Sequence, residues 1–250
     1  MVAKTYTIVY KDSVIDVNEI KSIIDSYGFM YNEQNPNYVF SFGGDGTFID
    51  AKNIAVKFDS IIVGFNYGNL GHYNEFKKGE LERVLSSISE RKVKEYYLLK
   101  INDTEYAINE LSIINPTYSV YIDVYHNEKL FEKYQGSGMA ISSPTGSTAL
   151  NKSLGGPMIL SNVNVFTLTP IAPIDNNYFS SLTSPIVFSG DDKVKLVITP
   201  LDGTIVNIDG YQKNFDSECV ITIARKKLRV LENEENNKNL ISKSFIRGEL

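Results

Sequence analysis

The chain has one cysteine, no long apolar run and no excess of positive charge, and each absence narrows the class of protein. Its lone cysteine, Cys219, cannot form a disulfide within the chain, so a reducing compartment is the simpler expectation. No stretch of about 18 apolar residues occurs, and residues 1–11 lack the apolar core of a signal peptide. The formal net charge of −5 provides no excess of positive charge with which to bind duplex nucleic acid or an anionic membrane. We expect a soluble, cytoplasmic protein with neither of these partners.

Two common nucleotide-binding motifs are also missing. The sequence has no GxxxxGK run followed by serine or threonine, which excludes a P-loop enzyme. Gly44-Asp45-Gly46 lacks a third glycine at the dinucleotide-binding spacing, which argues against an ordinary Rossmann NAD site. Any nucleotide site in this chain must therefore use a different phosphate loop.

Apolar residues in the first hundred positions alternate between strand and helix patterns. Predicted strands cover residues 5–10, 38–42 and 60–65, and helical spacing covers residues 17–27, 48–58 and 81–88. Short apolar strands that alternate with helices are typical of a parallel sheet covered on both faces. The sequence therefore predicts an N-terminal Rossmann-like α/β domain over residues 1–98.

From about Lys92 onward the pattern changes to mostly antiparallel β. Turn signals separate the predicted strands, and Ser147 to Leu154 is the one insertion with helical character. We predict a β-rich, β-sandwich-like C-terminal domain over residues 99–231, with residues 232–250 returning to the first domain. The fold class is then α/β plus all-β. The predicted strands of this second half cover residues 92–101, 118–125, 163–168, 193–198 and 220–224.

The sequence GGDGT, residues 43–47, follows a predicted strand and precedes a predicted helix. Glycines allow the backbone to approach a phosphate, and N–H groups at the start of a helix point toward it. A carboxylate at Asp45 makes sense there if it accepts a proton from an attacking hydroxyl or lies beside Mg²⁺. The alternative is a tight turn in which Asp45 caps the helix and Thr47 satisfies the backbone. The candidate phosphate-binding residues are Gly43, Gly44, Gly46 and Thr47.

Further motifs follow in a characteristic order. They are NYGNLG at residues 66–71, INE at 108–110, GSGMAISSPTGSTALNKSLGG at 136–156, Ser184-Pro185 and Asp209-Gly210. In this order and spacing the chain resembles the NAD kinase family, over roughly residues 38 to 210. GGDGT alone is shared with diacylglycerol and sphingosine kinases, whereas TGSTALNKSLGG is far more specific.

The resemblance implies transfer of the γ-phosphoryl group of ATP to the adenosine-ribose 2′-hydroxyl of NAD, with Mg²⁺ or another divalent cation. Some members accept polyphosphate as the donor. The GGDGT loop would lie between the domains, with Asp45 as the base or metal-linked carboxylate. Homodimers or homotetramers are implied, with NAD sites completed by the neighbouring subunit. The implied NAD-binding residues are Asn109, Glu110, Ser137, Thr148, Ala149, Ser153, Ala172 and His72.

The residues from Gly136 to Gly156 agree with a ligand-binding segment. Five glycines make the backbone permissive, and the five hydroxyl side chains between Ser142 and Thr148 offer neutral donors to ribose and amide groups. The alternative is a serine-rich connecting loop, which the length and the scarcity of charge make less attractive.

Several positions depart from the family pattern. Ser137 replaces the aspartate of a usual Arg-Gly-Asp-Gly, Leu150 replaces a tyrosine, and Asn177 stands where an arginine is common. These changes put the recognition of the nicotinamide end in doubt. His72 replaces an aromatic residue, and it is either a solvated or packing histidine or a group that stacks or hydrogen-bonds over the adenine or phosphates.

Three other functions are compatible with parts of the sequence. The departures allow a non-catalytic paralogue that only binds nucleotide, and GGDGT allows a lipid kinase. A structural αβ module without a ligand is the blandest alternative. The order and spacing of the motifs favour an NAD kinase over these three.

Overall fold

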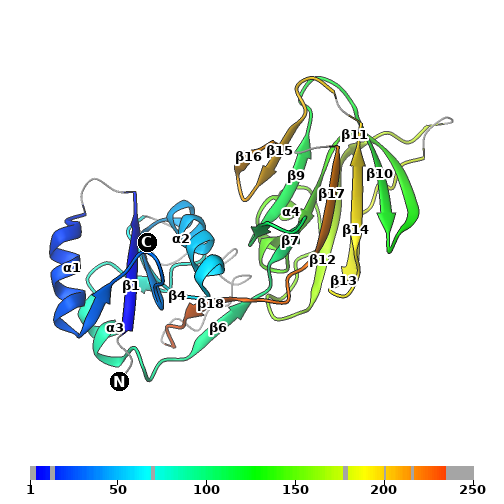
Figure 1. Ribbon diagram of the computed structural model, residues 1–250. Coiled ribbons are helices and arrows are strands. Elements are labelled where there is room, and N and C mark those ends of the chain that lie inside the picture. The colour runs from blue at the N-terminus through cyan, green and yellow to red at the C-terminus, as the bar shows by residue number, and fades with distance from the viewer. Residues whose placement is uncertain are drawn as a thin grey trace. The chain divides into compact units, whose positions relative to one another are not determined.

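The computed structural model describes residues 4–11, 15–68, 71–176, 180–199, 201–214 and 217–234 (Figure 1). The chain forms two compact units, each with its own sheet and core. Unit 1 comprises Met1–Tyr96 with Leu228–Leu250, and unit 2 comprises Tyr97–Lys227. Within the described ranges, no helix has the length and apolar character needed to cross a membrane.

Unit 1 is an α/β unit, as predicted. Its sheet has the order β2-β1-β3-β4-β18-β6, with β5 paired to β4. All pairs are parallel except β18 with β6. The elements are β1 (Lys4–Tyr10), α1 (Val17–Ser26), β2 (Phe29–Tyr31), β3 (Tyr38–Gly43), α2 (Asp45–Phe58), β4 (Ile61–Asn66), β5 (Phe76–Lys77), α3 (Leu81–Ser87), β6 (Val93–Tyr96) and β18 (Leu228–Leu231).

Helices cover both faces of this sheet. Side chains of α1 and α3 share one apolar cluster with alternate residues of β1, β3 and β4. Tyr6, Phe40 and Phe65 are examples from these three strands. Helix α2 contacts the same strands but contributes no side chain to that cluster, so it packs on the opposite face (Figure 1). Helix α1 starts where the Asp16 carboxylate accepts the N–H groups of Asn18 and Glu19.

Unit 2 is a β-rich unit, also as predicted. The strand order is β16-β15-β9-β11-β10-β14-β17-β7-β8, with β12 joining β11 to β13, and the pairs are antiparallel. The elements are β7 (Leu99–Ile101), β8 (Glu105–Ala107), β9 (Glu110–Ile114), β10 (Val120–His126), β11 (Lys129–Ser142), η1 (Thr145–Thr148), α4 (Leu150–Ser153), β12 (Val165–Pro173), β13 (Ile186–Ser189), β14 (Val194–Ile198), β15 (Ile205–Ile208), β16 (Tyr211–Lys213) and β17 (Glu218–Ile223).

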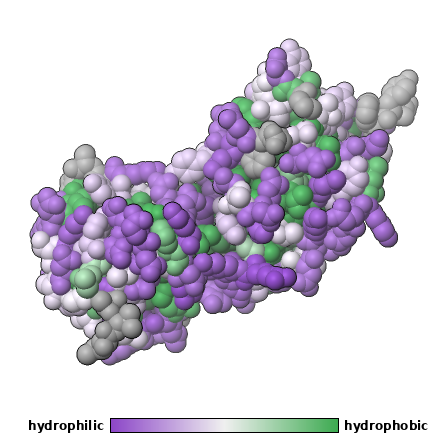
Figure 2. Space-filling view, viewed as in Figure 1, coloured by the Kyte–Doolittle hydropathy of each residue, from purple (hydrophilic) through white to green (hydrophobic). Residues whose placement is uncertain are grey.

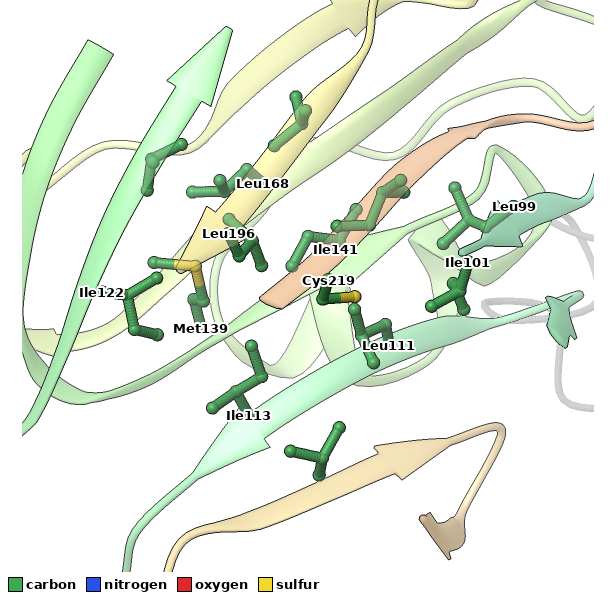
Figure 3. Packing of buried hydrophobic residues seen from close by; sticks show 14 of the residues in the cluster. Leu99, Ile101, Leu111, Ile113, Ile122, Met139, Ile141, Leu168, Leu196 and Cys219 are labelled. Carbon is green, nitrogen blue, oxygen red and sulfur yellow. The ribbon is translucent and has the colours of Figure 1, made fainter. Parts of the chain in front are cut away.

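The core of unit 2 is mainly aliphatic. Side chains from several strands point toward one another, among them Leu111, Met139, Ile141 and Leu196 (Figure 3). Cys219 lies in this cluster, and burial raises the pKa of its thiol to about 12. The lone cysteine is therefore a core residue with a protonated thiol.

Several sequence expectations about local structure were wrong. Residues 92–101 were predicted as one strand, but β6 and β7 belong to different units and are separated by Tyr97 and Leu98. Tyr96 is buried in unit 1, whereas Leu99 and Ile101 enter the core of unit 2. One apolar run thus contributes to two cores.

Strand β18 consists of four residues that the sequence assigned to the second domain, but it lies in the sheet of unit 1.

The glycine-rich segment from Gly136 to Gly156 begins inside the sheet. Its residues up to Ser142 form the end of β11, a 14-residue strand, so the alternative of a connecting loop does not describe them. At Gly138 a Cβ would lie 2.0 Å from the carbonyl oxygen of Ile113 on β9. The glycine allows close strand packing. Residues 147–154 were expected as one helix, but they divide at Ala149 into η1 and α4.

The surface is mixed in polarity. Figure 2 shows mainly hydrophilic residues on the face in view, with smaller groups of hydrophobic ones between them. In unit 2, Leu130, Phe131 and Val187 are large apolar residues that remain about half exposed. Large apolar side chains at this exposure are candidates for contacts with another protein surface.

Candidate functional site

The glycine loop joins β3 to α2 at the carboxyl end of the parallel sheet. Gly44 is the N-cap residue and provides no side chain, and the N–H groups of Thr47 and Phe48 bond to its carbonyl oxygen. Gly43 has a φ of +156°, and a Cβ there would lie 2.3 Å from the Thr47 hydroxyl oxygen. The buried Thr47 side chain occupies this space. The loop is therefore closely packed at Gly43, whereas at Gly44 no side chain or backbone atom of the described residues, its own chain neighbours aside, lies within 4 Å of an added Cβ.

Asp45 occupies the first turn of α2, and its carboxylate faces the segment that follows β4. Oδ1 accepts the backbone N–H of His72 at 2.9 Å and that of Tyr73 at 3.3 Å. Oδ2 lies 3.3 Å from Nδ1 of the His72 ring. The cap of α2 is Gly44, so the alternative in which Asp45 caps the helix does not describe this structure. Asp45 is oriented by another segment and keeps a third of its side chain exposed.

A lysine that the sequence reading missed lies beside this loop. Lys11 follows β1, and its Nζ lies 4.0 Å from the position of a Cβ on Gly46. The same Nζ pairs with Oδ2 of Asp50 at 2.7 Å, one turn along α2. A single lysine after a strand forms no recognisable motif. Its position beside the glycine loop follows from the parallel pairing of β1 with β3.

In unit 2, a second carboxylate holds the Asn109–Glu110 loop. Oδ1 of Asp209 accepts the N–H groups of Asn109 at 2.7 Å and Glu110 at 3.3 Å, and Oδ2 accepts that of Ile108 at 2.9 Å. Asp209 is 5% exposed and has a φ of +49°, followed by Gly210 at +81°. Two positive φ values in a two-residue loop between β15 and β16 are typical of a type I′ hairpin. Asp209-Gly210 is recognisable as a motif in the sequence, but this role of its carboxylate is not.

The carboxyl group of Glu110 is buried near another carboxylate, which disfavours its ionised form. Its carboxylate accepts the N–H of Leu150, and Oε2 is buried with no hydrogen bond from the described residues. Burial, and next the charge of Asp209, raise the pKa of Glu110 to about 7, although the Leu150 N–H opposes this. A half-desolvated carboxyl group with an unused oxygen is well suited to accept hydrogen bonds from ligand hydroxyls.

The segment from Ser143 to Leu150 packs directly on that loop. The Ser143 N–H bonds to the Asn109 carbonyl at 2.9 Å, and a Cβ on Gly146 would lie 2.0 Å from the same oxygen. Two of the hydroxyls expected to meet a ligand bond within the segment itself. Ser147 donates to the Pro144 carbonyl, and Thr148 donates to that of Thr145. Asn109, Glu110, Thr148 and Ala149 are therefore brought together.

The other predicted NAD-binding residues lie elsewhere. Ser137 and Ala172 are bracketed by the β11–β12 pairs Gly136 with Pro173 and Gly138 with Ile171. Glu110 instead pairs with Ser142, five residues from Ser137, or roughly 16 Å of strand. The predicted set thus divides into two groups at opposite ends of this stretch of β11. Ser153 is exposed at the end of α4, and His72 belongs to unit 1.

Ala172 has a backbone conformation that alanine rarely adopts. Its φ is +45°, and its carbonyl oxygen would lie 2.8 Å from a Cβ on Gly136. The Tyr134 hydroxyl bonds to the carbonyl oxygens of Gly138 and Ile171 on either side. This bend is therefore fixed by buried contacts. Asn177, expected to replace an arginine nearby, lies outside the described residues.

Family models and curated proteins agree on one family. Residues 31–93 match the ATP-NAD kinase N-terminal domain, and residues 106–232 match the ATP-NAD kinase C-terminal domain. An NAD kinase from Ureaplasma parvum serovar 3 is 32% identical over 249 residues, covering 94% of this chain and 91% of that protein. An NAD kinase from Limosilactobacillus reuteri is 31% identical over 249 residues, covering 92% of each.

Two solved structures have the same fold. An NAD kinase from Archaeoglobus fulgidus in complex with ATP superposes with a TM-score of 0.78 at 22% identity, over 96% of this chain and 98% of that one. Yeast NADH kinase complexed with NADH gives a TM-score of 0.77 at 18% identity, over 94% and 84%. The two-part α/β and β-rich architecture is thus shared with both.

Proposed function

Because the chain belongs to the NAD kinase family and phosphorylates NAD with ATP as the donor, we propose that Asp45 accepts the proton of the adenosine-ribose 2′-hydroxyl. The observation that supports this role is the fixed carboxylate beside the glycine loop, held by two N–H groups of another segment. A hydroxyl that loses its proton to Asp45 attacks the γ-phosphorus, and ADP departs in line. Gly43, Gly44 and Gly46 let the phosphates approach the start of α2, with Thr47 packed behind them.

A product assay tests the proposal. Purified protein is incubated with NAD and ATP, and an NADP-specific dehydrogenase reports the 2′-phosphorylated product. Phosphorus NMR then identifies which hydroxyl carries the new phosphate. Binding of NAD without product would favour the non-catalytic paralogue, and phosphate at another hydroxyl would reject the 2′ assignment. Both family models that match the chain describe NAD kinases, so no observation favours a lipid kinase.

The divalent cation is proposed to arrive with ATP. Within the described ranges, no group of three or more His, Cys, Asp or Glu side chains is placed to hold a metal ion. Mg²⁺ commonly uses substrate phosphates and water together with one or two carboxylates, and Asp45 is the carboxylate at this loop. Such an ion would neutralise charge on the phosphates, while this chain's residues orient the hydroxyl and remove its proton.

Glu110 and Asn109 are proposed to bind the adenosine part of NAD. Thr148 and Ala149 lie against the same loop and are proposed to contact NAD there, with Ser153 beyond them. Ribose hydroxyls donate hydrogen bonds best to an ionised carboxylate, and Oε2 of Glu110 has no such donor from the described chain.

NAD binding should therefore tighten as pH rises through the pKa of Glu110. At pH 6 most of this carboxyl, with its pKa of about 7, is protonated and must lose a proton on binding. At pH 8 it is already ionised, so the dissociation constant for NAD should be about tenfold lower than at pH 6. Calorimetry at pH 6 in two buffers of different ionisation enthalpy should show release of about one proton. In a Glu110→Gln variant both the pH dependence and the proton release should disappear; their persistence would reject this role.

His72 is proposed to position Asp45 in the reaction. Replacing His72 by phenylalanine removes the ring nitrogen near Oδ2 but retains the backbone donor, so kcat should fall about fivefold with little change in either KM. His72→Asn should restore most of the rate, since its amide can donate at a similar place. The other histidine, His126, pairs with Asp192 in unit 2, and His126→Phe is the matched control. Equal rates for His72→Phe and the natural protein would contradict the prediction.

An oligomer is proposed because the predicted NAD-binding residues divide into two groups. Ser137 and Ala172 lie roughly 16 Å along β11 from the register of Glu110, so we propose that they serve a neighbouring subunit's NAD. The half-exposed Leu130, Phe131 and Val187 offer apolar surface for a homodimer or homotetramer. A cytoplasmic location is proposed from the lone, buried Cys219.

A further inference from the structure

Strand order in unit 1 singles out one place on its sheet. The order β2-β1-β3-β4 means that the chain moves from β1 outward to β2, returns to β3 on the other side of β1, and continues in that direction. All these pairs are parallel. In open α/β sheets, ligands bind outside the carboxyl ends of the strands where the order reverses. Here that point lies between β1 and β3.

The segments leaving these two strands carry complementary chemistry. The glycine loop follows β3, and Lys11 follows β1 directly. The register pairs Tyr10, the residue before Lys11, with Phe42, the residue before Gly43. The lysine amine and the phosphate loop therefore start from the same level of the sheet. Nζ of Lys11 is then 4.0 Å from the position of a Cβ on Gly46.

We propose that Lys11 binds the phosphates of ATP and that Asp50 holds its amine in place for this. The glycine loop itself supplies backbone N–H groups but no cationic side chain, and it carries the acidic Asp45. A triphosphate beside it needs positive charge, and an ammonium group meets phosphate oxygens as a strongly hydrogen-bonding point charge. The inference depends on ATP as the donor and is independent of the role of Asp45.

The ion pair with Asp50 does not remove Lys11 from this task. The Lys11 side chain is 54% exposed and that of Asp50 is 30% exposed, so this ion pair lies at the surface, where a ligand can reach it. An ammonium group has three donors, so contact with Oδ2 of Asp50 is compatible with contact to phosphate oxygens. Anchoring a flexible lysine also reduces the rotamer entropy lost when the phosphates bind.

Binding measurements on Lys11 variants test the proposal. Lys11→Ala should weaken ATP binding about tenfold and raise the KM for ATP by a similar factor, with the KM for NAD unchanged. AMP, which lacks the β- and γ-phosphates, should bind both proteins nearly alike. Lys57→Ala is the matched control, because that amine lies over the Phe58 ring at the far end of the same helix. Lys11→Arg should retain most of the affinity for ATP.

A double-mutant cycle separates phosphate binding from a local ion pair. Asp50→Asn should raise the KM for ATP less than Lys11→Ala does, and the double variant should be no worse than Lys11→Ala alone. Equal ATP affinity for Lys11→Ala and the natural protein would overturn the proposal, as would additive effects in the double variant. Calorimetric ATP binding gives this answer even if Asp45 proves not to be the base, so the two ideas fail separately.

Discussion

Replacing Asp45 by asparagine is expected to lower kcat about a thousandfold while NAD binds with nearly unchanged affinity. Asparagine has the same shape, and its side-chain oxygen can still accept the N–H groups of His72 and Tyr73 that hold Oδ1. The lost function is proton acceptance, because an amide has almost no basicity. The loss should therefore appear in kcat and only weakly in the dissociation constant for NAD, measured by NADP formation and by calorimetry.

The control for this variant is Asp59→Asn, at the other end of α2. Asp59 has a φ of +58°, a conformation that asparagine tolerates well, so the fold should be unaffected. Its activity should match that of the natural protein. If Asp45→Asn retained more than about a tenth of the natural kcat, Asp45 would not be the base, since general base catalysis contributes at least two orders of magnitude.

Asp209→Asn is expected to reduce kcat/KM for NAD roughly thirtyfold, with a much smaller change in the KM for ATP. The carboxylate accepts three backbone N–H groups of residues 108–110, and an asparagine side chain offers one oxygen and an NH₂ group that would oppose an N–H. A buried N–H that loses its partner costs about 1 to 3 kcal/mol. The loop that carries Glu110 should therefore shift, and the free energy of unfolding should fall by about 2 kcal/mol.

Asp209→Asn should also change the pKa of Glu110, which distinguishes this substitution from one that only disturbs the fold. The negative charge of Asp209 helps to raise the pKa of Glu110, so the pKa should fall in Asp209→Asn and NAD binding should depend less on pH between 6 and 8. Asp202→Asn is the control, because Asp202 lies in a different turn of unit 2 and is exposed. It should change neither kcat/KM for NAD nor the pH dependence of NAD binding. An unchanged kcat/KM for NAD in Asp209→Asn would show that the loop keeps its geometry without this carboxylate.

The sequence predicted features whose cause is local. In unit 1 the strands β1, β3 and β4 and the helices α1, α2 and α3 each show an apolar pattern, and the glycine loop indicates a sharp junction between β3 and α2. The α/β and β-rich fold class and the family followed from such patterns and from motif order, and both are confirmed. The roles of Asp45 and of the NAD-binding residues remain predictions that the proposed variants test.

Features set by distant contacts escaped prediction. The Asp209 carboxylate meets N–H groups about a hundred residues earlier, and such a contact leaves no local pattern. The position of Lys11 beside Gly46 likewise depends on the strand order, which no local pattern in the sequence indicates. The close packing of Gly138 could not be predicted either, because glycine composition does not distinguish a flexible backbone from one packed against a carbonyl group.

Strand β18 has a consequence for how this chain matures during translation. It lies between β4 and β6, and among the described pairs β6 joins the sheet through β18 alone. The sheet of unit 1 is therefore complete only after unit 2, which is one continuous stretch, has been synthesised. Domains generally fold as units during synthesis. The unit that carries the phosphate loop precedes unit 2 in the chain but is thus expected to reach its finished form after it.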